Sequence, residues 1–275
     1  MSFAIVRVSW TPLRREPGHA SEMVSQVLLG EVVEILESAR SGDSSPDWAA
    51  ARAPDGYEGF VTRGSLRECD AAAAREWSGQ ADLTSLGTGL SPLKGGVATP
   101  RYAPWGARLV SGEAGVIELP DGTRADPSDA TRLVADAERP DRYPYDPAAL
   151  VRTAAMWLGT PYVWGGRTEH GVDCSGYVQA VFGLHGHALA RDSRDQCAAG
   201  PRVVSAAGET ESPAGDLWFF GWDGGPVSHV GICLGGRRMI HASETRGCVA
   251  IDELGEGDFG RRLADGFVGA VRPPG

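Results

Sequence analysis

Short stretches in which apolar and polar residues alternate fill the first quarter of the chain. Val27, Leu29 and residues 31–35 follow this pattern, as expected for strands with one buried face. Further strand-like runs are FAIVRVSW, DWAAARA and GYEGFVT, and the segments SGDSSPD and APDG between them carry the Gly, Pro and Asp typical of chain reversals. The pattern over residues 3–66 predicts a small β-barrel.

A second stretch with weaker strand and turn patterns follows a short alanine-rich segment at residues 71–75. It covers residues 77–133 and includes LSPLKGG, GARLVSG and GVIELPDGT. The next segment, DAERPDRYPYDP, is charged and rich in proline, as expected for a connection between domains. We therefore predict a first barrel at residues 1–68, and a second barrel with its linker at residues 69–140.

Helical spacing replaces the alternating pattern after this linker. Asp146 followed by Pro147 suits a helix start, and apolar residues then recur at helical spacing, which predicts a helix over residues 147–158. A second helix is predicted over residues 174–184. Four strand-like stretches follow: DLWFFG, SHVGICLG, RMIHAS with GCVAIDEL, and GFVGAVR. Helices followed by an antiparallel sheet predict an α+β domain at residues 141–275.

The composition is that of a globular protein, with 42% hydrophobic and 23% charged residues in a chain of 275. The length alone suggests roughly two domains, and the 38 glycines and 18 prolines indicate many turns between short elements. The net charge of −10 has the wrong sign for binding nucleic acid phosphates or anionic lipid. We therefore expect neither nucleic acid nor membrane as a partner.

The absence of targeting signals and the spacing of the cysteines indicate where the protein resides and which sites it lacks. No apolar run approaches the ~18 residues that a membrane-spanning helix needs, and the N-terminal segment lacks a signal-peptide pattern, so we expect a soluble, cytoplasmic protein. The five cysteines are dispersed and form no CxxC pair, which argues against a disulfide framework or a structural zinc site. We expect no cofactor, and no pattern indicates an oligomeric state.

Cys174 is the most specific local feature, because it lies where the loop HGVD passes into the helical run CSGYVQAVFGL. A cysteine in a first helical turn is close to unpaired N–H groups and to the positive end of the helix dipole. Both should lower the thiol pKa and favour the nucleophilic thiolate. Most isolated cysteines are instead small buried apolar residues, and this is expected of the remaining four: Cys69, Cys197, Cys233 and Cys248.

Two histidines could complete a catalytic site, because a cysteine nucleophile needs an imidazole base and a polar group that orients the imidazole. His229 begins the run HVGICL, and His241 lies in RMIHAS beyond a glycine turn. If a three-residue loop joins these strands and Leu234 pairs with Arg238, the two histidines are diagonal neighbours on one face of the sheet. A two-residue turn would place them on opposite faces, and no triad would form.

Other interpretations of these residues are weaker. A zinc site made of Cys174, His229 and His241 lacks a fourth ligand and a closely spaced ligand pair. The remaining histidines are expected to be ordinary surface or core residues without a chemical role: His19, His170, His185 and His187.

The same motifs resemble a known family. GTPYVWGGRTEHGVDCSGYVQAVF, followed by RDSRDQ, PAGDLWFFG, VSHVGICLG and MIHAS, is similar to the NlpC/p60 cell-wall cysteine peptidases over residues 141–275. The resemblance implies a papain-like fold with Cys174 as nucleophile, His229 as base and His241 as orienting residue. It also implies that the phenol of Tyr162 lies beside the Cys174 backbone N–H at the oxyanion; a half-buried aromatic without a role is the alternative.

The N-terminal pattern, SEMVSQVLLGE followed by WAAARAPDGYEGFV, resembles a bacterial SH3-like (SH3b) domain. Two SH3b-like barrels before a papain-like NlpC/p60 domain resemble the γ-D-glutamyl-L-diamino acid endopeptidases. This implies cleavage of free murein stem peptides, in peptidoglycan recycling or wall-peptide degradation, between γ-D-Glu and meso-diaminopimelate or L-Lys. It further implies a requirement for an unblocked N-terminal L-Ala and a first barrel that walls the pocket.

Such a pocket needs acceptors for an ammonium and donors for the α-carboxylate of D-Glu. By position in the motifs, Glu22, Tyr57 and Asp192 would face the amine. Ser175, Ser193 and Arg191 would face the carboxylate, and Asp173 completes the implied set. Solvated surface charges are the alternative for Glu22 and Asp192.

Two other functions stay open from the sequence. One is a wall-peptide-binding protein whose catalytic fold is inert; the other is a related amidase or acyltransferase on the same core, since the thiolate chemistry is shared. Slow reaction with iodoacetamide, without titration below the free thiol value near 8.5, would be expected of an inert buried thiol.

Overall fold

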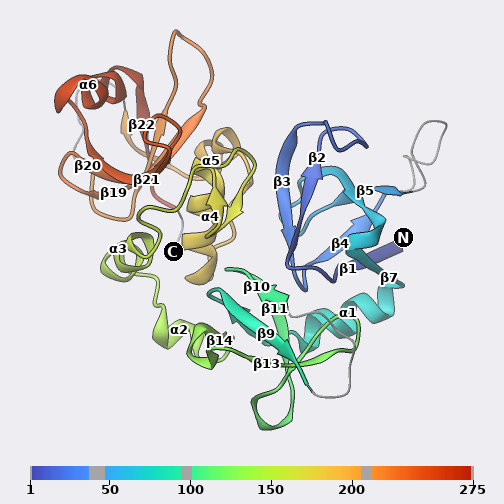
Figure 1. Ribbon diagram of the computed structural model, residues 1–275. Helices are drawn as coiled ribbons and strands as arrows, with labels where there is room; N and C mark the ends of the chain where they lie inside the picture. The colour runs from blue at the N-terminus through green and yellow to red at the C-terminus, as the bar shows by residue number, and fades with distance from the viewer. Residues whose placement is uncertain (1, 37–46, 94–100, 206–211, 274–275) are drawn as a thin grey trace. The chain divides into compact units, whose positions relative to one another are not determined.

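The computed structural model describes residues 2–36, 47–93, 101–205 and 212–273. The chain forms two units, residues 1–139 and 140–275, which are described separately (Figure 1). Within the described part of the chain, none of the helices has the length and apolar character required to cross a bilayer.

The first unit begins with a seven-stranded antiparallel sheet in the order β3-β2-β6-β5-β4-β1-β7. Its strands are β1 (Ser2–Val6), β2 (Trp10–Arg14), β3 (Met23–Leu28), β4 (Val32–Ile35), β5 (Trp48–Arg52), β6 (Glu58–Thr62) and β7 (Leu66–Cys69), with the short helix η2 (Arg63–Ser65) before β7. Alternate side chains such as Val33 and Ile35 pack in one buried cluster with Leu13 and Val61. The predicted small barrel is confirmed.

The two predicted turns of this barrel differ in outcome. The APDG segment forms a turn closed by a hydrogen bond from the Gly56 N–H to the Ala53 carbonyl, with Gly56 at φ +85°. Most of the SGDSSPD segment, residues 41–46, lies outside the described residues.

A second seven-stranded antiparallel sheet follows, in the order β10-β9-β13-β12-β11-β8-β14. Its elements are β8 (Leu83–Ser85), β9 (Thr88–Pro92), β10 (Arg101–Ala103), β11 (Arg108–Ser111), η3 (Glu113–Gly115), β12 (Ile117–Glu118), β13 (Arg124–Pro127), η4 (Ala130–Arg132) and β14 (Leu133–Ala135). Leu29, directly after β3 of the first sheet, is part of the second sheet's buried cluster, together with Leu90 and Leu109. Gly30 permits the contact, because a Cβ there would lie 1.7 Å from the Arg108 carbonyl oxygen.

The alanine-rich segment between the sheets forms helix α1 (Ala71–Gln80), which the sequence pattern did not predict. The Asp70 carboxylate caps it by accepting the Ala73 N–H at 2.8 Å. Trp77, which the sequence analysis placed at the start of the second β-rich segment, lies in this helix and donates its indole N–H to the Gly30 carbonyl. The helix packs on β1, β7 and β11, and therefore joins the two sheets (Figure 1).

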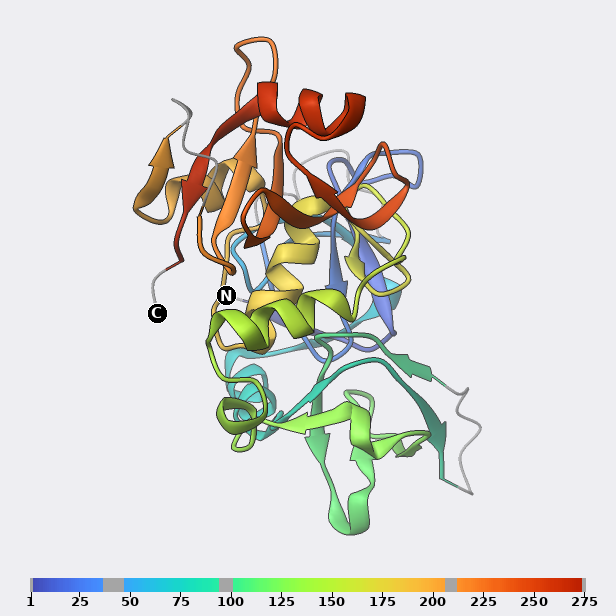
Figure 2. The same cartoon turned by 90° about the vertical axis from the view of Figure 1, so that its left-hand side faces the viewer.

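The second unit combines helices with a six-stranded antiparallel sheet in the order β17-β22-β18-β19-β20-β21. Its helices are α3 (Pro147–Ala155), α4 (Cys174–Leu184), α5 (Ser193–Ala198) and α6 (Gly257–Gly266), with the short α2 (Arg139–Arg142) at the junction of the units. Its strands are β15 (Arg167–Thr168), β16 (Gly171–Val172), β17 (Arg202–Ser205), β18 (Leu217–Phe220), β19 (His229–Gly235), β20 (Arg238–Ser243), β21 (Cys248–Glu253) and β22 (Phe267–Val271). Figure 2 shows α3 beside α4, and α4 packs against β19 and β20.

The predicted elements of this α+β domain are found with small changes. Helix α4 has the predicted bounds, whereas α3 ends at Ala155 and continues as tighter i→i+3 turns to Leu158 before Gly159 at φ +83°. The strand-like stretches form β18 to β22. Helices α5 and α6 and strand β17 were not predicted from the sequence.

Candidate active site

A β-bulge sets the register of the hairpin that carries the two histidines. Ile232 pairs with Ile240 and Cys233 with Met239, but the next pair is Gly235 with Arg238, so Leu234 is the extra residue. The turn beyond that pair has two residues, not the three we expected. The bulge restores the register that the sequence analysis required, so the expectation that a two-residue turn would separate the histidines is wrong.

His229 and His241 are in direct contact on one face of this hairpin. The Nε2 atom of His229 lies 2.7 Å from Nδ1 of His241, and the ring centroids are 4.9 Å apart. Gly231 lies beside His241: a Cβ at this glycine would approach the His241 Cβ to 3.0 Å. The sheet therefore brings the two imidazoles together where the sequence predicted them.

A buried carboxylate continues this line of side chains. His241 is fully buried, and its Nε2 lies 3.0 Å from Oδ2 of Asp252 on β21. Because His241 pairs with Ala250 across the strands, Asp252 two residues further on lies on the same face of the sheet. Arg246 also donates to the Asp252 carboxylate. The sequence analysis missed Asp252, although the alternation of GCVAIDEL placed it on one face with Ala250.

Cys174 is the first residue of α4, and the preceding residue, Asp173, caps this helix by accepting the Gly176 N–H at 2.8 Å. Gly176 allows the helix start to approach the preceding loop, because a Cβ there would lie 2.2 Å from the Gly166 carbonyl oxygen. The thiol itself receives the backbone N–H of Val230, the residue after His229. The predicted nucleophile is thus held at the start of the strand that carries the predicted base.

The thiol pKa differs in direction from the sequence-based expectation. Burial raises the pKa of Cys174 to about 12, and the Asp173 carboxylate raises it further, whereas the N–H groups of Val230 and Ser175 only partly oppose this. The capping carboxylate at the helix start offsets the positive end of the helix dipole on which the expectation relied. The resting thiol is therefore protonated near neutral pH.

The His229 imidazole is neutral in the same state. Burial lowers the pKa of His229 well below its ordinary value, and a charge on His241 would lower it further. A protonated thiol and a neutral imidazole are the states that general-base transfer of the thiol proton requires, in place of a preformed ion pair.

Tyr162 lies in the electrostatic surroundings of the thiol. Its phenol pKa is raised well above the ordinary value by burial, and then by the charges that Cys174 and Asp173 would carry. A backbone bridge to Val172 and a hydrogen bond from the Tyr162 N–H to the Gly247 carbonyl fix the segment. The phenol is therefore near enough to Cys174 for the two charges to influence each other; its position beside the Cys174 N–H and its oxyanion role stay predictions.

Two of the residues expected to bind a substrate carboxylate, Arg191 and Ser175, form a buried network with Asp173. Arg191 contacts both oxygens of Asp173, with Nη2 2.5 Å from Oδ2, and donates from Nη1 to the Ser175 hydroxyl at 2.9 Å. Ser193 is buried at the start of α5, directly after the partly exposed Asp192. Arg191 thus neutralises the carboxylate that caps α4, a structural role that the sequence did not indicate.

The two site residues from the first barrel lie near each other in the first unit. Glu22 is exposed and accepts from the guanidinium of Arg15 at 2.7 Å, and Tyr57 is close enough to influence the charge on the same arginine. Tyr57 also packs on the buried cluster of the first sheet. The approach of both residues to Cys174 stays a prediction.

The remaining histidines and cysteines have other surroundings. His185 is buried, with Nδ1 2.7 Å from the Pro144 carbonyl and Nε2 2.9 Å from the Thr153 hydroxyl, and His187 stacks on Tyr145. The structure thus gives these two a packing role. All five cysteines are free thiols, and within the described ranges the Cys, His and acidic side chains form no cluster suited to a metal ion.

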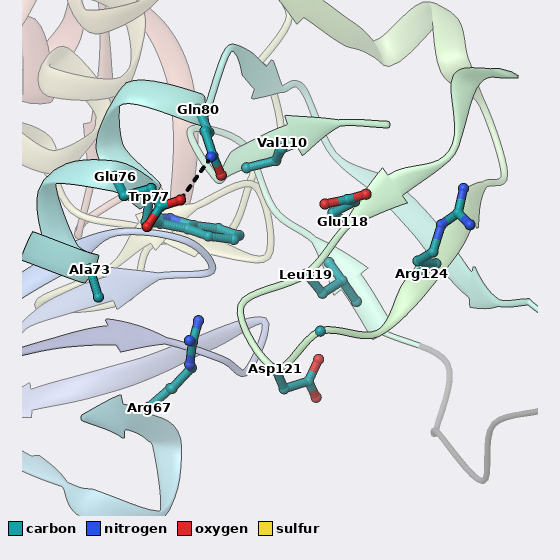
Figure 3. Close-up of a pocket in the computed structure, with 11 residues that line it drawn as sticks. Arg67, Ala73, Glu76, Trp77, Gln80, Val110, Glu118, Leu119, Asp121 and Arg124 are labelled. Carbon is teal, nitrogen blue, oxygen red and sulfur yellow. Dashed lines mark hydrogen bonds between the residues drawn. The ribbon is translucent and has the colours of Figure 1, made fainter. Parts of the chain in front are cut away.

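A pocket of about 450 Å³ in the first unit lies between α1 and strands β11 to β13 (Figure 3). Arg67, Glu118 and Arg124 give it charges of both signs, and Gln80 donates to Glu76 at its rim. Its lining includes no cysteine or histidine, so it offers no nucleophile or base of the kind found in the second unit.

Comparison with known proteins finds two family matches. Residues 159–266 match the NlpC/P60 family, and residues 13–66 match the bacterial dipeptidyl-peptidase Sh3 domain. The chain is 36% identical to gamma-D-glutamyl-L-lysine dipeptidyl-peptidase of Bacillus subtilis over 42% of its own length and 38% of that protein. A relative of the same name from Bacillus cereus is covered over 32% of its length, so the chain spans about a third of these two proteins.

Two similarities extend over nearly the whole chain. Dipeptidyl-peptidase 6 of Lysinibacillus sphaericus is 28% identical over 92% of both chains. The crystal structure of an NlpC/P60 family protein from Bacillus cereus has a TM-score of 0.78 at 22% identity, and covers 98% of this chain and 99% of its own. The second likeness concerns the fold alone.

Proposed function

We propose that this chain, which has an NlpC/P60 domain after a bacterial dipeptidyl-peptidase SH3 domain, is a cysteine peptidase acting on murein stem peptides. The bond that we propose it hydrolyses joins γ-D-Glu to the L-diamino acid, meso-diaminopimelate or L-Lys. The substrate is a free peptide with an unblocked N-terminal L-Ala, such as arises when wall peptides are degraded or recycled.

One observation carries the catalytic part of this proposal. Cys174 receives the N–H of Val230, and the adjacent His229 lies 2.7 Å from His241. This arrangement supports Cys174 as the proposed nucleophile, His229 as the base and His241 as the orienting residue.

The chemistry follows from the protonation states of the resting site. His229 takes the thiol proton as the Cys174 sulfur attacks the carbonyl carbon of the γ-linked D-Glu, and the carbonyl oxygen becomes an oxyanion. The C–N bond then breaks, and His229 returns the proton to the leaving α-amine of the diamino acid. Water, deprotonated by His229, next cleaves the thioester, so that the dipeptide acid leaves and the thiol is restored.

The proposed specificity concerns the two charged groups of the dipeptide. By the resemblance, Ser175, Ser193 and Arg191 face the α-carboxylate of D-Glu; the Ser175 hydroxyl, which donates to Asp173 Oδ1 at 3.2 Å, would turn its hydrogen to the substrate. By the family resemblance, Asp192, Glu22 and Tyr57 are the candidates for binding the free ammonium of L-Ala. The relatives named for the γ-D-glutamyl-L-lysine bond and as dipeptidyl-peptidase 6 support this substrate class.

Peptide cleavage followed by mass spectrometry tests the proposal. L-Ala-γ-D-Glu-meso-diaminopimelate and its L-Lys analogue are incubated with the protein, each with and without an N-acetyl group. We expect the dipeptide L-Ala-γ-D-Glu and the free diamino acid from at least one unblocked peptide, and no product from the acetylated ones. Equal cleavage of both forms would refute the requirement for a free amine, and no cleavage of any peptide would refute the substrate.

Matched variants separate the chemistry from folding. Cys174→Ala should abolish cleavage with an unchanged circular dichroism spectrum, and Cys69→Ala, which removes a thiol from strand β7, should leave turnover intact. Glu22→Gln should raise KM for the unblocked peptide. Glu58→Gln removes the carboxylate of another arginine pair of the same sheet, Arg52 with Glu58, and should not change KM.

A further inference from the structure

Asp252 is a buried carboxylate at the end of a chain of hydrogen-bonding side chains, which begins at His229 and continues through His241. Its Oδ2 atom lies 3.0 Å from His241 Nε2, and its side chain is 6% exposed. We propose that Asp252 is a positioning residue that sets the tautomers of both histidines, so that the lone pair of His229 is available for the thiol proton. This inference rests on the proposed function, because it concerns the base of that reaction.

The first step is that Asp252 can only accept hydrogen bonds. Burial alone would raise the pKa of Asp252, but the hydrogen bonds from His241 and Arg246 outweigh it and hold the pKa below its ordinary value. An ionised carboxylate has no proton to donate. The hydrogen of the contact between His241 and Asp252 therefore belongs to Nε2 of His241.

The second step is that the tautomer of His241 determines the tautomer of His229. A neutral imidazole carries one N–H, so a hydrogen on His241 Nε2 leaves its Nδ1 as an acceptor. The contact of 2.7 Å between that Nδ1 and His229 Nε2 then requires the hydrogen to reside on His229 Nε2. His229 Nδ1 is left with its lone pair, and this nitrogen is the one that can accept the proton of Cys174.

The His241 ring and the Asp252 carboxylate are both buried. The Phe259 ring stacks parallel to His241, with an interplanar angle of 15°, and the Arg246 guanidinium lies 4.9 Å from the centre of the same ring. Arg246 also donates to Oδ1 of Asp252, the carboxylate oxygen that does not contact His241. A carboxylate enclosed in this way holds its hydrogen bond more strongly than one in water.

The same arrangement favours the charged state of the reaction. When His229 takes the thiol proton on Nδ1, its Nε2–H continues to point to His241 Nδ1, and the His241 Nε2–H continues to point to Asp252. The imidazolium is thus stabilised by the carboxylate through His241, and no proton beyond that of the thiol has to move. Delivery of the proton to the leaving amine returns both rings to the starting tautomers.

An isosteric variant reverses the tautomers. In Asp252→Asn, the Arg246 guanidinium should hold the amide oxygen, because Arg246 makes its shorter contact to Oδ1. The amide N–H then points to His241 Nε2, which becomes an acceptor. His241 Nδ1 must donate to His229 Nε2, and the hydrogen of His229 moves to Nδ1, where it blocks the base.

Nitrogen-15 NMR of histidine-labelled protein at neutral pH reads these tautomers without any substrate. We expect both rings of the native protein as Nε2–H tautomers and both rings of Asp252→Asn as Nδ1–H tautomers. The kcat of Asp252→Asn should fall by at least about 100-fold with little change in KM, because tautomer reversal in a comparable triad costs about 10⁴-fold. Glu253→Gln makes the same chemical change at an exposed neighbour on β21 and should alter neither spectrum nor kcat.

Each outcome has a separate meaning. An Nδ1–H tautomer of His229 in the native protein, or unchanged tautomers in Asp252→Asn, would overturn the inference, and the native spectrum provides this test even if the variant does not fold. Reversed tautomers together with full peptidase activity would also overturn it. If the native protein shows the expected tautomers but cleaves no murein peptide, the proposed function fails while the assignment of the hydrogens stands.

Discussion

Asp173 and Arg191 form a buried ion pair in which the guanidinium Nη2 lies 2.5 Å from the carboxylate Oδ2 and both side chains are less than one-tenth exposed. The same carboxylate caps α4 and accepts the Gly165 N–H at 2.9 Å. The pair therefore fixes the start of the helix that carries Cys174 and the loop that precedes it.

Removal of the guanidinium should destabilise the protein strongly. Arg191→Met leaves the Asp173 carboxylate buried and uncompensated, so we expect the free energy of unfolding to fall by about 3–5 kcal/mol, measured by urea denaturation. Arg261→Met breaks an ion pair with Asp258 in which both side chains are exposed, and should have little effect. A loss below about 1 kcal/mol for Arg191→Met would contradict the role assigned to this ion pair.

Two glycines of α4 should respond in opposite ways to the same substitution. In Gly176→Ala the new Cβ would lie 2.2 Å from the Gly166 carbonyl oxygen, a backbone atom that cannot move aside without shifting the loop. We expect a lower melting temperature and loss of cleavage. Gly183→Ala meets nothing within 4 Å and should stabilise the helix by about 0.5–1 kcal/mol. Similar melting temperatures for the two variants would show that the close approach to Gly166 is unimportant.

Gly231 should be required for the contact between the histidines. A Cβ at this position would lie 3.0 Å from the His241 Cβ and 3.0 Å from the Met239 sulfur. The methionine side chain can move away, whereas His241 is held on its far side by Asp252, so Gly231→Ala should displace the imidazole from His229. We expect kcat to fall by roughly 10²-fold, the cost of a misplacement near 1 Å. Unchanged kcat in a folded variant would contradict this.

Activity should persist into mildly acidic solution. His229 acts as a base when it is neutral, and its pKa is lowered well below the ordinary value, so protonation inactivates it only at correspondingly low pH. The acid limb of kcat/KM should therefore have its midpoint below about 6.5, the ordinary pKa of histidine. A midpoint above that value would show that the imidazole is more readily charged than its buried setting allows.

The thiol should remain protonated over the same range. Because burial raises the pKa of Cys174 to about 12, its alkylation by iodoacetamide should be slow at neutral pH, and the rate should keep rising with pH beyond the free thiol pKa of about 8.5. Mass spectrometry of the Cys174 peptide measures this rate apart from the other four thiols. Fast alkylation at pH 7 would indicate a preformed thiolate. Slow alkylation consequently does not identify an inert fold, contrary to the sequence-based expectation, and turnover is the test that distinguishes the two.

The sequence predicted those parts of the site that depend on local pattern. The helix at residues 174–184 and the strands of both histidines could be located because their apolar periodicity and turn residues are regular. The common face of His229 and His241 was also predicted, but that prediction relied on a three-residue loop between their strands. The bulge at Leu234 has no local signal, since it arises from how the two strands fit together.

The rest of the site depends on tertiary contacts. The role of Asp252 requires the pairing of His241 with Ala250 on β21. The sequence of one strand does not determine its register with the next, so this pairing could not be predicted. The direction of the thiol pKa was wrong because burial and the Asp173 carboxylate outweigh the helix dipole, and neither term can be assessed from spacing. Arg191 was expected to bind substrate, but in the structure it contacts Asp173. This contact could not be predicted, because the sequence around Asp173 does not show that the loop carrying Arg191 folds against it.

The bulge at Leu234 also determines which changes in chain length the catalytic hairpin tolerates. Without Leu234, Cys233 opposite Met239 would be followed directly by Gly235 opposite Arg238, an uninterrupted ladder with both histidines still on one face. Removal of one residue between His229 and Cys233 would instead turn His229 to the opposite face. The tip of this hairpin can therefore lose Leu234 without separating the histidines, whereas the short stretch that follows His229 has a fixed length.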